Sequence, residues 1–431
     1  MEKTTNMTSL KDKLASMVPG IRERVRNLVK EHGNKIIADV NVEQIIGGMR
    51  GVKSLICDTS EVGLDTGLIV RGTMIAQLTD KLPEEIFYLL LTGELPDEES
   101  LKDLQSELKK RSEVPQYIWD ILNSFPNNAH PMSMFGSCIT ALEHESKFRV
   151  AYDRGMKKDV YWEYTLEDSL DLIAKLPGIA AGIYRIRFVK GDIIKTNIEL
   201  DWASDYAYML GVSDGNEQWY DLMRLYLVLH CDHESGNVSA LTSHVVGSAL
   251  SDVYYSLAAG LNGLAGPLHG LANQECLKFV LELIKHFNGV PTDEEMKKFT
   301  KERLDRGLVI PGYGHAVLRV TDPRFTAFLE WGNKIIPDDE RFIVVQKLFK
   351  IVPDILIEQG KAKDPWPNVD AGSGAFLYHY GLTEFEYYTV LFGVSRALGI
   401  CSQLILSRIM GEPITRPKSI TLDWLEKEVQ K

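Results

Sequence analysis

Cysteine is scarce in this chain and is never closely paired in the sequence. Only five cysteines occur among 431 residues, at Cys57, Cys138, Cys231, Cys276 and Cys401. No C-x-x-C pair is present and the number is odd, which excludes a disulfide framework or a zinc ribbon as the basis of the fold. This usage is typical of a protein from a reducing compartment.

Positive charge is also in short supply. The chain has 48 Lys and Arg residues against 60 Asp and Glu residues, a net charge of −12. Because nucleic-acid-binding proteins normally carry the opposite balance, no nucleic-acid partner is expected. An anionic ligand would have to be held by basic residues gathered locally against this overall field.

Long alternations of strand type are few, and helical periodicity dominates. Apolar residues recur at helical spacing in two clear places, Leu104–Leu122 and Leu277–Ile284. The best strand candidates are short, at Ile36–Val42 and Ser54–Asp58. The composition, 45% hydrophobic and 25% charged, is that of an ordinary globular protein. We therefore predict an all-α fold of about two domains.

One stretch almost lacks charged residues. Between Ser235 and Gln274 the only Asp, Glu, Lys or Arg is Asp252. A run of this length raises the question of a membrane span. Small polar residues are scattered through it, however, and several glycines interrupt its second half. These features favour buried helices or a subunit interface, and no membrane partner is expected.

Two motifs invite a catalytic interpretation that their context does not favour. Gly211-Val-Ser213-Asp-Gly215 matches the nucleophile elbow of serine hydrolases, but that elbow needs a preceding strand, and Asp201–Leu210 is typical of a helix. His230-Cys-Asp-His233-Glu234 has the wrong order for either zinc-protease motif, so a buried polar cluster at a helix end is the simpler interpretation.

Three other polar residues stand in glycine-rich settings. His269 lies between Gly266 and Gly270, His315 follows Pro311-Gly-Tyr-Gly314, and Asp370 precedes Ala371-Gly-Ser-Gly374. Two histidines and a carboxylate in such turns suit proton transfer beside a small substrate. Spacing alone leaves a structural role equally open.

Taken together, these segments resemble the citrate synthase family in its eukaryotic, mitochondrial form. The resemblance runs from about Leu10 to the C-terminus. The residues that carry it are Gly266-Pro-Leu-His-Gly-Leu-Ala-Asn-Gln-Glu275, Pro311-Gly-Tyr-Gly-His-Ala-Val-Leu-Arg319, Thr321-Asp-Pro-Arg324 and Lys361-Ala-Lys-Asp-Pro-Trp-Pro-Asn-Val-Asp370, with support from Gly48-Met-Arg-Gly51 and Ser395-Arg-Ala-Leu-Gly399.

This resemblance implies an all-α homodimer with a large and a small domain in each subunit. The large domain would comprise residues 1–269 and 376–431, and the small domain residues 270–375. The implied reaction condenses acetyl-CoA with oxaloacetate and water to give citrate and CoA, and it uses no metal and no cofactor. Oxaloacetate would bind first and close the cleft between the domains.

The family pattern also implies a role for each site residue. Asp370 would be the base, His269 would donate to the thioester oxygen, and His315 would polarise the oxaloacetate carbonyl. The oxaloacetate contacts would be His233, Arg324, Arg396 and, from the partner subunit, Arg416. The CoA contacts would be Arg50, Val309, Gly312, Tyr313, Gly314, Arg319, Lys361 and Lys363.

Three alternatives stay open from the sequence. The nearest is 2-methylcitrate synthase, which performs the same chemistry on propionyl-CoA. The others are a serine hydrolase that uses Ser213 and a non-catalytic helical scaffold. The start at Met1 without a recognisable presequence favours a bacterial cytoplasm, with a trimmed protein of the mitochondrial matrix as the alternative.

Overall fold

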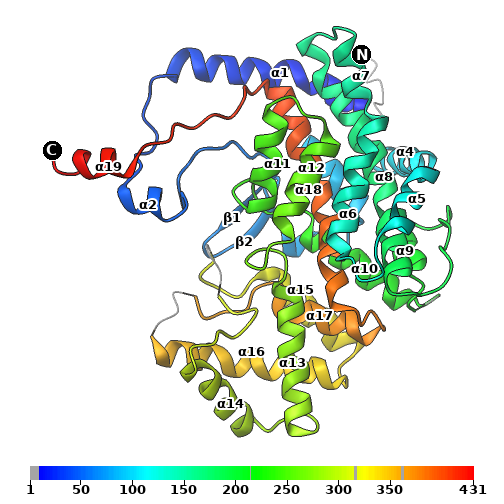
Figure 1. Cartoon of the computed structure of the whole chain (residues 1–431), viewed down its shortest axis with the longest axis vertical. Helices are drawn as coiled ribbons and strands as arrows, with labels where there is room; N and C mark the ends of the chain where they lie inside the picture. The colour runs from blue at the N-terminus through cyan, green and yellow to red at the C-terminus, as the bar shows by residue number, and fades with distance from the viewer. Residues whose placement is uncertain (1–8, 214, 315–317, 361–363) are drawn as a thin grey trace, which may run out of the picture.

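The structure, a computed structural model, describes residues 9–213, 215–314, 318–360 and 364–431. It is mostly helical (Figure 1), which confirms the predicted fold class. The helices before the glycine-rich turn at His269 are α1 (Leu10–His32), α2 (Val42–Ile46), α3 (Pro83–Thr92), α4 (Glu98–Arg111), α5 (Gln116–Ser124), α6 (Pro131–Ala141), α7 (Lys147–Asp153), α8 (Tyr161–Arg187), α9 (Trp202–Leu210), α10 (Glu217–His230), α11 (Val238–Ser248) and α12 (Val253–Leu264).

The helices after that turn are α13 (Ala272–Phe287), α14 (Asp293–Asp305), α15 (Pro323–Ile335), α16 (Glu340–Gln359), α17 (Asp370–His379), α18 (Tyr388–Met410) and α19 (Leu422–Glu428). Four short 3-10 turns are η1 (Ile75–Gln77), η2 (Leu142–Glu145), η3 (Lys158–Val160) and η4 (Phe385–Tyr387).

A small antiparallel sheet lies beside the helices, with the order β1 (Ser60–Gly63), β2 (Gly67–Val70) and β3 (Thr73–Met74). Ser60 stands opposite Val70 in its register. The strand predictions for Ile36–Val42 and Ser54–Asp58 are wrong, because neither segment pairs with another strand. In the first of them Ile36 is 77% exposed, so its apolar residues do not cover a face of this subunit.

The main core surrounds α18, whose side chains are nearly all buried. It packs against α8, α10 and α12. In the described part of the chain, Phe385–Met410 is the one segment long and apolar enough to cross a membrane, and 89% of its apolar window is buried in the protein. Such burial is typical of the central helix of a globular core. The nearly charge-free stretch forms α11 and α12, which pack closely on each other.

A second hydrophobic cluster lies at one end of the molecule, where α13, α14, α16 and α17 gather (Figure 1). All its buried residues fall between Phe279 and Ala375. The domain division predicted from the sequence stays a proposal, since α17 runs across the boundary at residue 375 and its Phe376 belongs to the main cluster.

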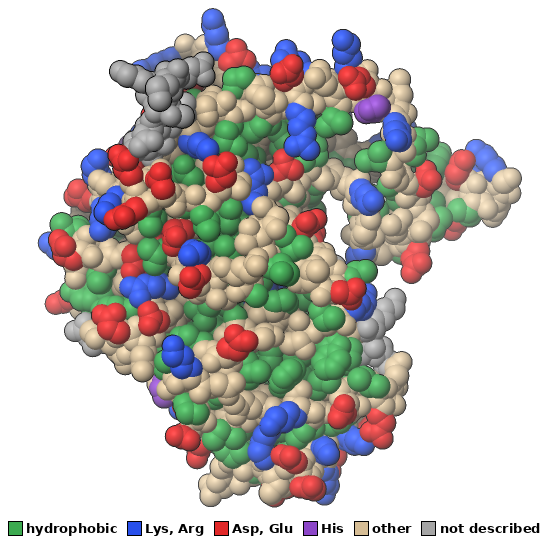
Figure 2. Space-filling model, turned by 180° about the vertical axis from the view of Figure 1, so that it is seen from behind, with side chains coloured by type: hydrophobic (Ala, Val, Ile, Leu, Met, Phe, Trp, Pro, Cys, Tyr) green, Lys and Arg blue, Asp and Glu red, His purple; other side chains and the backbone are tan. Residues whose placement is uncertain are grey.

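Two segments leave the body together as an arm, which we define as residues 33–58 with α2 and residues 412–431 with α19 (Figure 1). The arm displays large apolar side chains: Ile46 is 71%, Leu422 67% and Trp424 50% exposed. Figure 2 shows a hollow between this arm and the body. An arm with so much exposed apolar surface is typical of a segment that packs on another subunit.

Candidate active site

His269 lies in the turn between α12 and α13. The glycine that follows it has a packing reason: a Cβ at Gly270 would lie 2.1 Å from the backbone oxygen of Leu264 and 2.9 Å from a methyl carbon of Thr389. Close approach of the turn to α12 and α18 therefore requires glycine at this position.

The bonding partner of His269 defines its tautomer. The backbone N–H of Ser239 donates to Nε2 over 3.2 Å, and the Ser239 hydroxyl lies 2.9 Å from the same nitrogen. Since a backbone N–H can only donate, Nε2 must accept, and a neutral ring then carries its proton on Nδ1. Burial, together with the positive charge of Arg396, lowers the pKa of His269 to about 4. His269 is thus a neutral Nδ1–H donor at pH 7.

Asp370 is the first residue of α17. Its backbone N–H donates to the side-chain oxygen of Asn368 over 3.0 Å. Burial raises the pKa of its carboxyl group to about 6, while the positive charges of Arg324 and Arg396 lower it and Asp322 raises it. A carboxylate with this pKa is ionised at pH 7 yet basic enough to accept a proton, which is the condition a general base requires.

Arg324 is buried at the start of α15 and is bound by a carboxylate two residues before it. Its Nε lies 3.0 Å from Oδ1 of Asp322, and its Nη2 lies 2.7 Å from Oδ2. The pair is bidentate, which fixes the plane of the guanidinium group. Burial opposes the charge of Arg324, but the charge of Asp322 and its hydrogen bonds raise the pKa above the ordinary value.

Arg396 enters the same region from the middle of α18. Its Nε donates to the backbone oxygen of His230 over 3.1 Å, its Nη1 lies 3.4 Å from Oδ1 of Asn237, and its guanidinium group stacks over Phe392 at 4.8 Å. Burial lowers its pKa to about 10, so it stays charged at pH 7. Two buried arginines beside one carboxylate make a locally positive site in a protein of negative net charge.

The sequence assigned no role in the site to the supporting residues. His230 ends α10 and is fully buried; burial lowers its pKa to about 3, and its Nδ1 lies 2.8 Å from the backbone oxygen of Tyr226. A carbonyl only accepts, so Nδ1 carries the proton. Asn237, Ser239 and Asp322 each bond a predicted site residue. For Asn237 and Ser239 the available sequence signal was the segment Asn237-Val-Ser239, whose polar residues lie at a helix start.

The glycine-rich loop before His315 is fastened to the segment that leads to Asp370. Gly314 donates its N–H to the backbone oxygen of Trp366 over 3.0 Å, and Gly312 accepts from the N–H of Asn368 over 2.9 Å. Gly312 and Gly314 have φ of +81° and +98°, values that favour glycine. Tyr313 forms a bridge with Pro367, while Val309 is 75% exposed.

The structure gathers some of the predicted residues and not others. His269, Asp370, Arg324 and Arg396 act on one another's charges and form one cluster. Arg50 and Arg416 are exposed and lie on the arm. His315, Lys361 and Lys363 lie outside the described residues.

Two predicted residues lie at the edges of this cluster. His233 follows α10, and its backbone oxygen accepts from the amide of Asn237 over 2.9 Å. The exposed Arg319 donates its backbone N–H to the backbone oxygen of Leu64 over 2.9 Å, which places this segment beside the end of β1.

The two disfavoured motifs fit their simpler interpretations. Ser213 follows a helix, α9, whose C-cap Gly211 has φ of +65°, so the strand that a nucleophile elbow needs is missing before it. Among the described residues no group of three or more His, Cys, Asp or Glu side chains is arranged to hold a metal ion.

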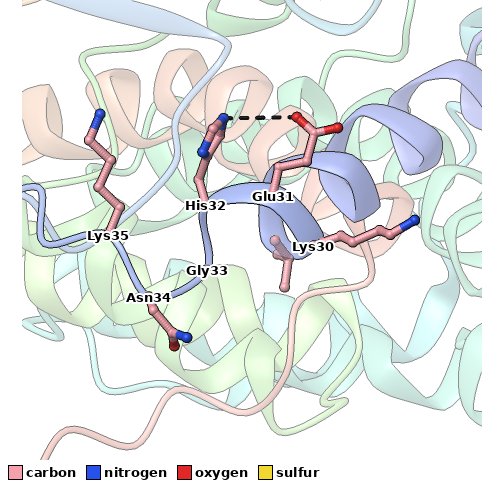
Figure 3. A pocket seen from close by; sticks show the side chains of 7 residues that line it. Lys30, Glu31, His32, Gly33, Asn34 and Lys35 are labelled. Atoms are coloured by element: carbon pink, nitrogen blue, oxygen red, sulfur yellow. Dashed lines mark ion pairs between the residues drawn. The ribbon is translucent and has the colours of Figure 1, made fainter.

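Two surface pockets lie apart from this cluster. One is lined by residues 29–35 at the end of α1, where His32 pairs with Glu31 (Figure 3). The other lies between α10 and the loop after α15, around Asp339 and His379. Neither is lined by His269, Asp370, Arg324 or Arg396.

Comparison with known proteins gives the family. The model of the citrate synthase C-terminal domain matches residues 48–418. The chain belongs to the citrate synthase family. It is 49% identical to a probable mitochondrial citrate synthase of Glossina morsitans morsitans, over 98% of this chain and 93% of that protein. It is also 49% identical to the mitochondrial citrate synthase of Xiphias gladius, over 98% and 92%.

Solved structures agree with this family. The citrate synthase of Pyrobaculum aerophilum superposes with a TM-score of 0.78 at 29% identity, covering 88% of this chain and 92% of that one. The Thermoplasma acidophilum enzyme, solved as a ternary complex with carboxymethyl coenzyme A and oxaloacetate, has a TM-score of 0.76 at 21% identity, covering 89% and 97%. At that identity the likeness shows the fold alone.

These relatives decide two of the open questions. The chain is an enzyme, a transferase that makes citrate, and the matches support citrate synthase rather than 2-methylcitrate synthase. The expectation of a bacterial cytoplasm is wrong, because the relatives at 49% identity are named mitochondrial and point to that organelle.

Proposed function

We propose that His269 and Asp370 perform the enolisation of acetyl-CoA in this enzyme. A thioester methyl group is a very weak acid, so a base needs a donor that stabilises the enol oxygen as the proton leaves. Asp370 accepts the methyl proton. His269 donates its Nδ1–H to the thioester oxygen, while the Ser239 N–H holds Nε2 and so fixes the tautomer.

Oxaloacetate binding falls to the buried arginines. Asp322 occupies Nε and Nη2 of Arg324, so Nη1 faces one substrate carboxylate. The bonds of Arg396 use Nε and Nη1, so Nη2 serves the other. His233 and Arg416 of the partner subunit complete the site. The enol carbon then attacks the oxaloacetate carbonyl, His315 supplies a proton to the new alkoxide, and water cleaves the citryl thioester into citrate and CoA.

The CoA chain would lie along the Val309–Gly314 loop, where backbone groups would meet the adenine. Arg50, Arg319, Lys361 and Lys363 would contact its phosphates. Attachment of this loop to Trp366 and Asn368 couples the CoA site to the position of Asp370, so CoA binding and the base would be placed together.

The observation that carries the proposal is the raised pKa of the buried Asp370 carboxyl group in one cluster with a neutral His269. The test is release of CoA thiol from acetyl-CoA with and without oxaloacetate. Asp370→Asn should lower kcat by at least ~10², with oxaloacetate binding little changed. Asp354→Asn, on the exposed face of α16, is the matched control. Near-normal turnover of the Asp370 variant in a folded protein would refute the assignment.

We infer that the enzyme is a homodimer and that its cleft closes on oxaloacetate. The exposed apolar arm supports the dimer, as do Val238 and Val245 on α11, which are 53% and 42% exposed. The second hydrophobic cluster, between Phe279 and Ala375, supports closure, because bodies with their own cores can move as units. Small-angle scattering should give a more compact particle at saturating oxaloacetate, and an unchanged curve would count against closure.

A further inference from the structure

The tail that carries Arg416 leaves the body at the end of α18. Gly411, with φ of +74°, ends the helix, and Glu412 donates its N–H back to Ser407 over 3.2 Å. Pro413 and Pro417 then restrict the backbone around them. Because the residue before a proline favours extended conformations, Arg416 is held extended from Thr415 onward. The side chain of Arg416 projects from an exposed position.

Thr415, the residue before Arg416, is fastened to α11 by two bonds. Its backbone N–H donates to the hydroxyl oxygen of Ser248 over 2.9 Å. Its own hydroxyl lies 3.2 Å from Nε2 of His244. Ser248 in turn donates to the backbone oxygen of Val245 over 2.7 Å, which leaves its oxygen free to accept. The backbone N–H and the hydroxyl of Thr415 are thus both bonded to one helix.

His244 contacts the tail a second time. Its Nδ1 lies 3.9 Å from a carboxylate oxygen of Glu412, and the two side chains are 14% and 20% exposed. One mostly buried imidazole therefore contacts two residues of the tail, Glu412 and Thr415. Neither the catalytic cluster nor the CoA loop uses His244 or Ser248, and both residues lie on the face of α11 that looks toward the tail. A structural helix-end role would not need contacts on both ring nitrogens.

We propose that His244 and Ser248 are positioning residues that hold Thr415 so that Arg416 is presented to the active site of the partner subunit. This rests on the proposed role of Arg416 in oxaloacetate binding. An arginine on an untethered arm loses more conformational freedom when it binds a carboxylate, and that loss weakens binding. The contacts of His244 and Ser248 with Thr415, which we call the clamp, reduce this loss of conformational freedom before the substrate arrives. Its removal should therefore raise the KM for oxaloacetate and leave kcat and the KM for acetyl-CoA unchanged.

The test compares variants at two positions of the clamp, His244 and Thr415, in the full-length enzyme. His244→Leu removes both ring contacts at similar size, and Thr415→Val removes the hydroxyl. Each should raise the oxaloacetate KM about three- to tenfold, the range of the net contribution of one hydrogen bond. His244→Gln, whose amide can reach the position of Nε2, should restore most of the affinity. Thr242→Val, on the same helix, is the matched control and should leave the KM unchanged.

A double-mutant cycle separates positioning from a general effect on the site. If His244 acts only through the arginine, Arg416→Ala combined with His244→Leu should have the KM of Arg416→Ala alone. An unchanged KM in His244→Leu overturns the proposal, and so does a full additional increase in the Arg416→Ala background. A wild-type KM in Arg416→Ala itself would instead show that the assigned role of Arg416 is wrong, and the clamp would fall with it.

Thermal melting and gel filtration accompany each variant. A melting temperature and an elution volume like those of the wild type, together with a raised KM for oxaloacetate, support a positioning role. If His244→Leu does not fold, Thr415→Val decides, because it changes only one hydroxyl on the tail. A loss of dimer in step with the loss of affinity would overturn the proposal in favour of a structural role at the interface.

Discussion

At the scale of single residues, burial gives two ionisable groups of the site opposite tasks. It raises the pKa of Asp370 to about 6 and lowers that of His269 to about 4. In its proposed role as the base, Asp370 must be ionised to accept a proton, so kcat/KM should fall as the pH drops through about 6, with slope one. His269 stays neutral over this range and adds no second step. A pH–rate profile on acetyl-CoA checks this, and a plateau extending below pH 5 would contradict it.

A second buried carboxyl group, that of Glu84, affects the stability of the fold and not catalysis. Glu84, at the start of α3, accepts from the N–H of Trp202 over 3.0 Å, and its other oxygen is buried without a partner. Burial raises its pKa to about 7 from 4.5, with Asp201 adding to the shift. The folded state therefore keeps a proton that the unfolded chain releases. By linkage, the stability contributed by Glu84 is complete below pH 4.5 and is lost as the pH rises through about 7.

Glu84→Gln removes this ionisation and keeps the acceptor for Trp202. The variant should be more stable than the wild type at pH 8, by about 1–3 kcal/mol for a shift of this size, and should gain little at pH 4.5. Melting temperatures of both proteins at pH 8 and pH 4.5, taken at one protein concentration, measure this difference in stability. The exposed Glu99→Gln is the control. Equal shifts in melting temperature at both pH values would argue against a buried ionisation.

At the scale of elements, Gly312 joins the CoA loop to two helices. A Cβ at Gly312 would lie 2.6 Å from Sγ of Cys276 on α13 and 2.7 Å from Cα of Ala371 on α17. Gly312→Ala should therefore displace the loop, raise the KM for acetyl-CoA and lower the melting temperature. Gly307→Ala is a matched control, since Gly307 has a similar φ of +76° but open space around it. Equal effects of the two changes would mean that backbone strain alone, and not packing, explains them.

The same elements show what could be predicted from the sequence. Helices around Leu104, Ile118 and Leu277 follow from apolar spacing, because an amphipathic period is a local property and these side chains are buried as expected. The partner of His269 could not be found in this way. Ser239 lies 30 residues away, and its N–H reaches the imidazole only through the packing of α11 on α12. Likewise Asn237 meets Arg396 across 159 residues.

Apolar content alone misled where the apolar side chains are not covered by the rest of the described subunit. Ile36 and Ile37 have the residue types of a strand and are 77% and 74% exposed. An apolar segment takes a defined structure only when something covers it. The predicted site residues on the arm, Arg50 and Arg416, are exposed in the same way. Their predicted ligand contacts are therefore not formed within this subunit's cluster.

At the scale of the whole molecule, a shared active site makes a sharp prediction. If Arg416 serves the partner's site, then in a mixed dimer of His269→Ala and Arg416→Ala subunits one site receives both defects and the other receives none. Random subunit exchange makes half of the dimers mixed, so about a quarter of wild-type activity should return from two inactive proteins. The recovered activity is measured by thiol release after subunit exchange. Exchange itself is confirmed with differently tagged subunits.

The control for that experiment uses two defects that lie in the same subunit's cluster. His269→Ala mixed with Asp370→Asn leaves every site of a mixed dimer with one defect, so no activity should return. Recovery in this control would mean that subunits complement for another reason. Absence of recovery in the Arg416 mixture, with exchange confirmed, would mean that Arg416 serves its own subunit. The arm would then be only a dimerisation device, since its exposed apolar side chains, Trp424 among them, would still need to be covered.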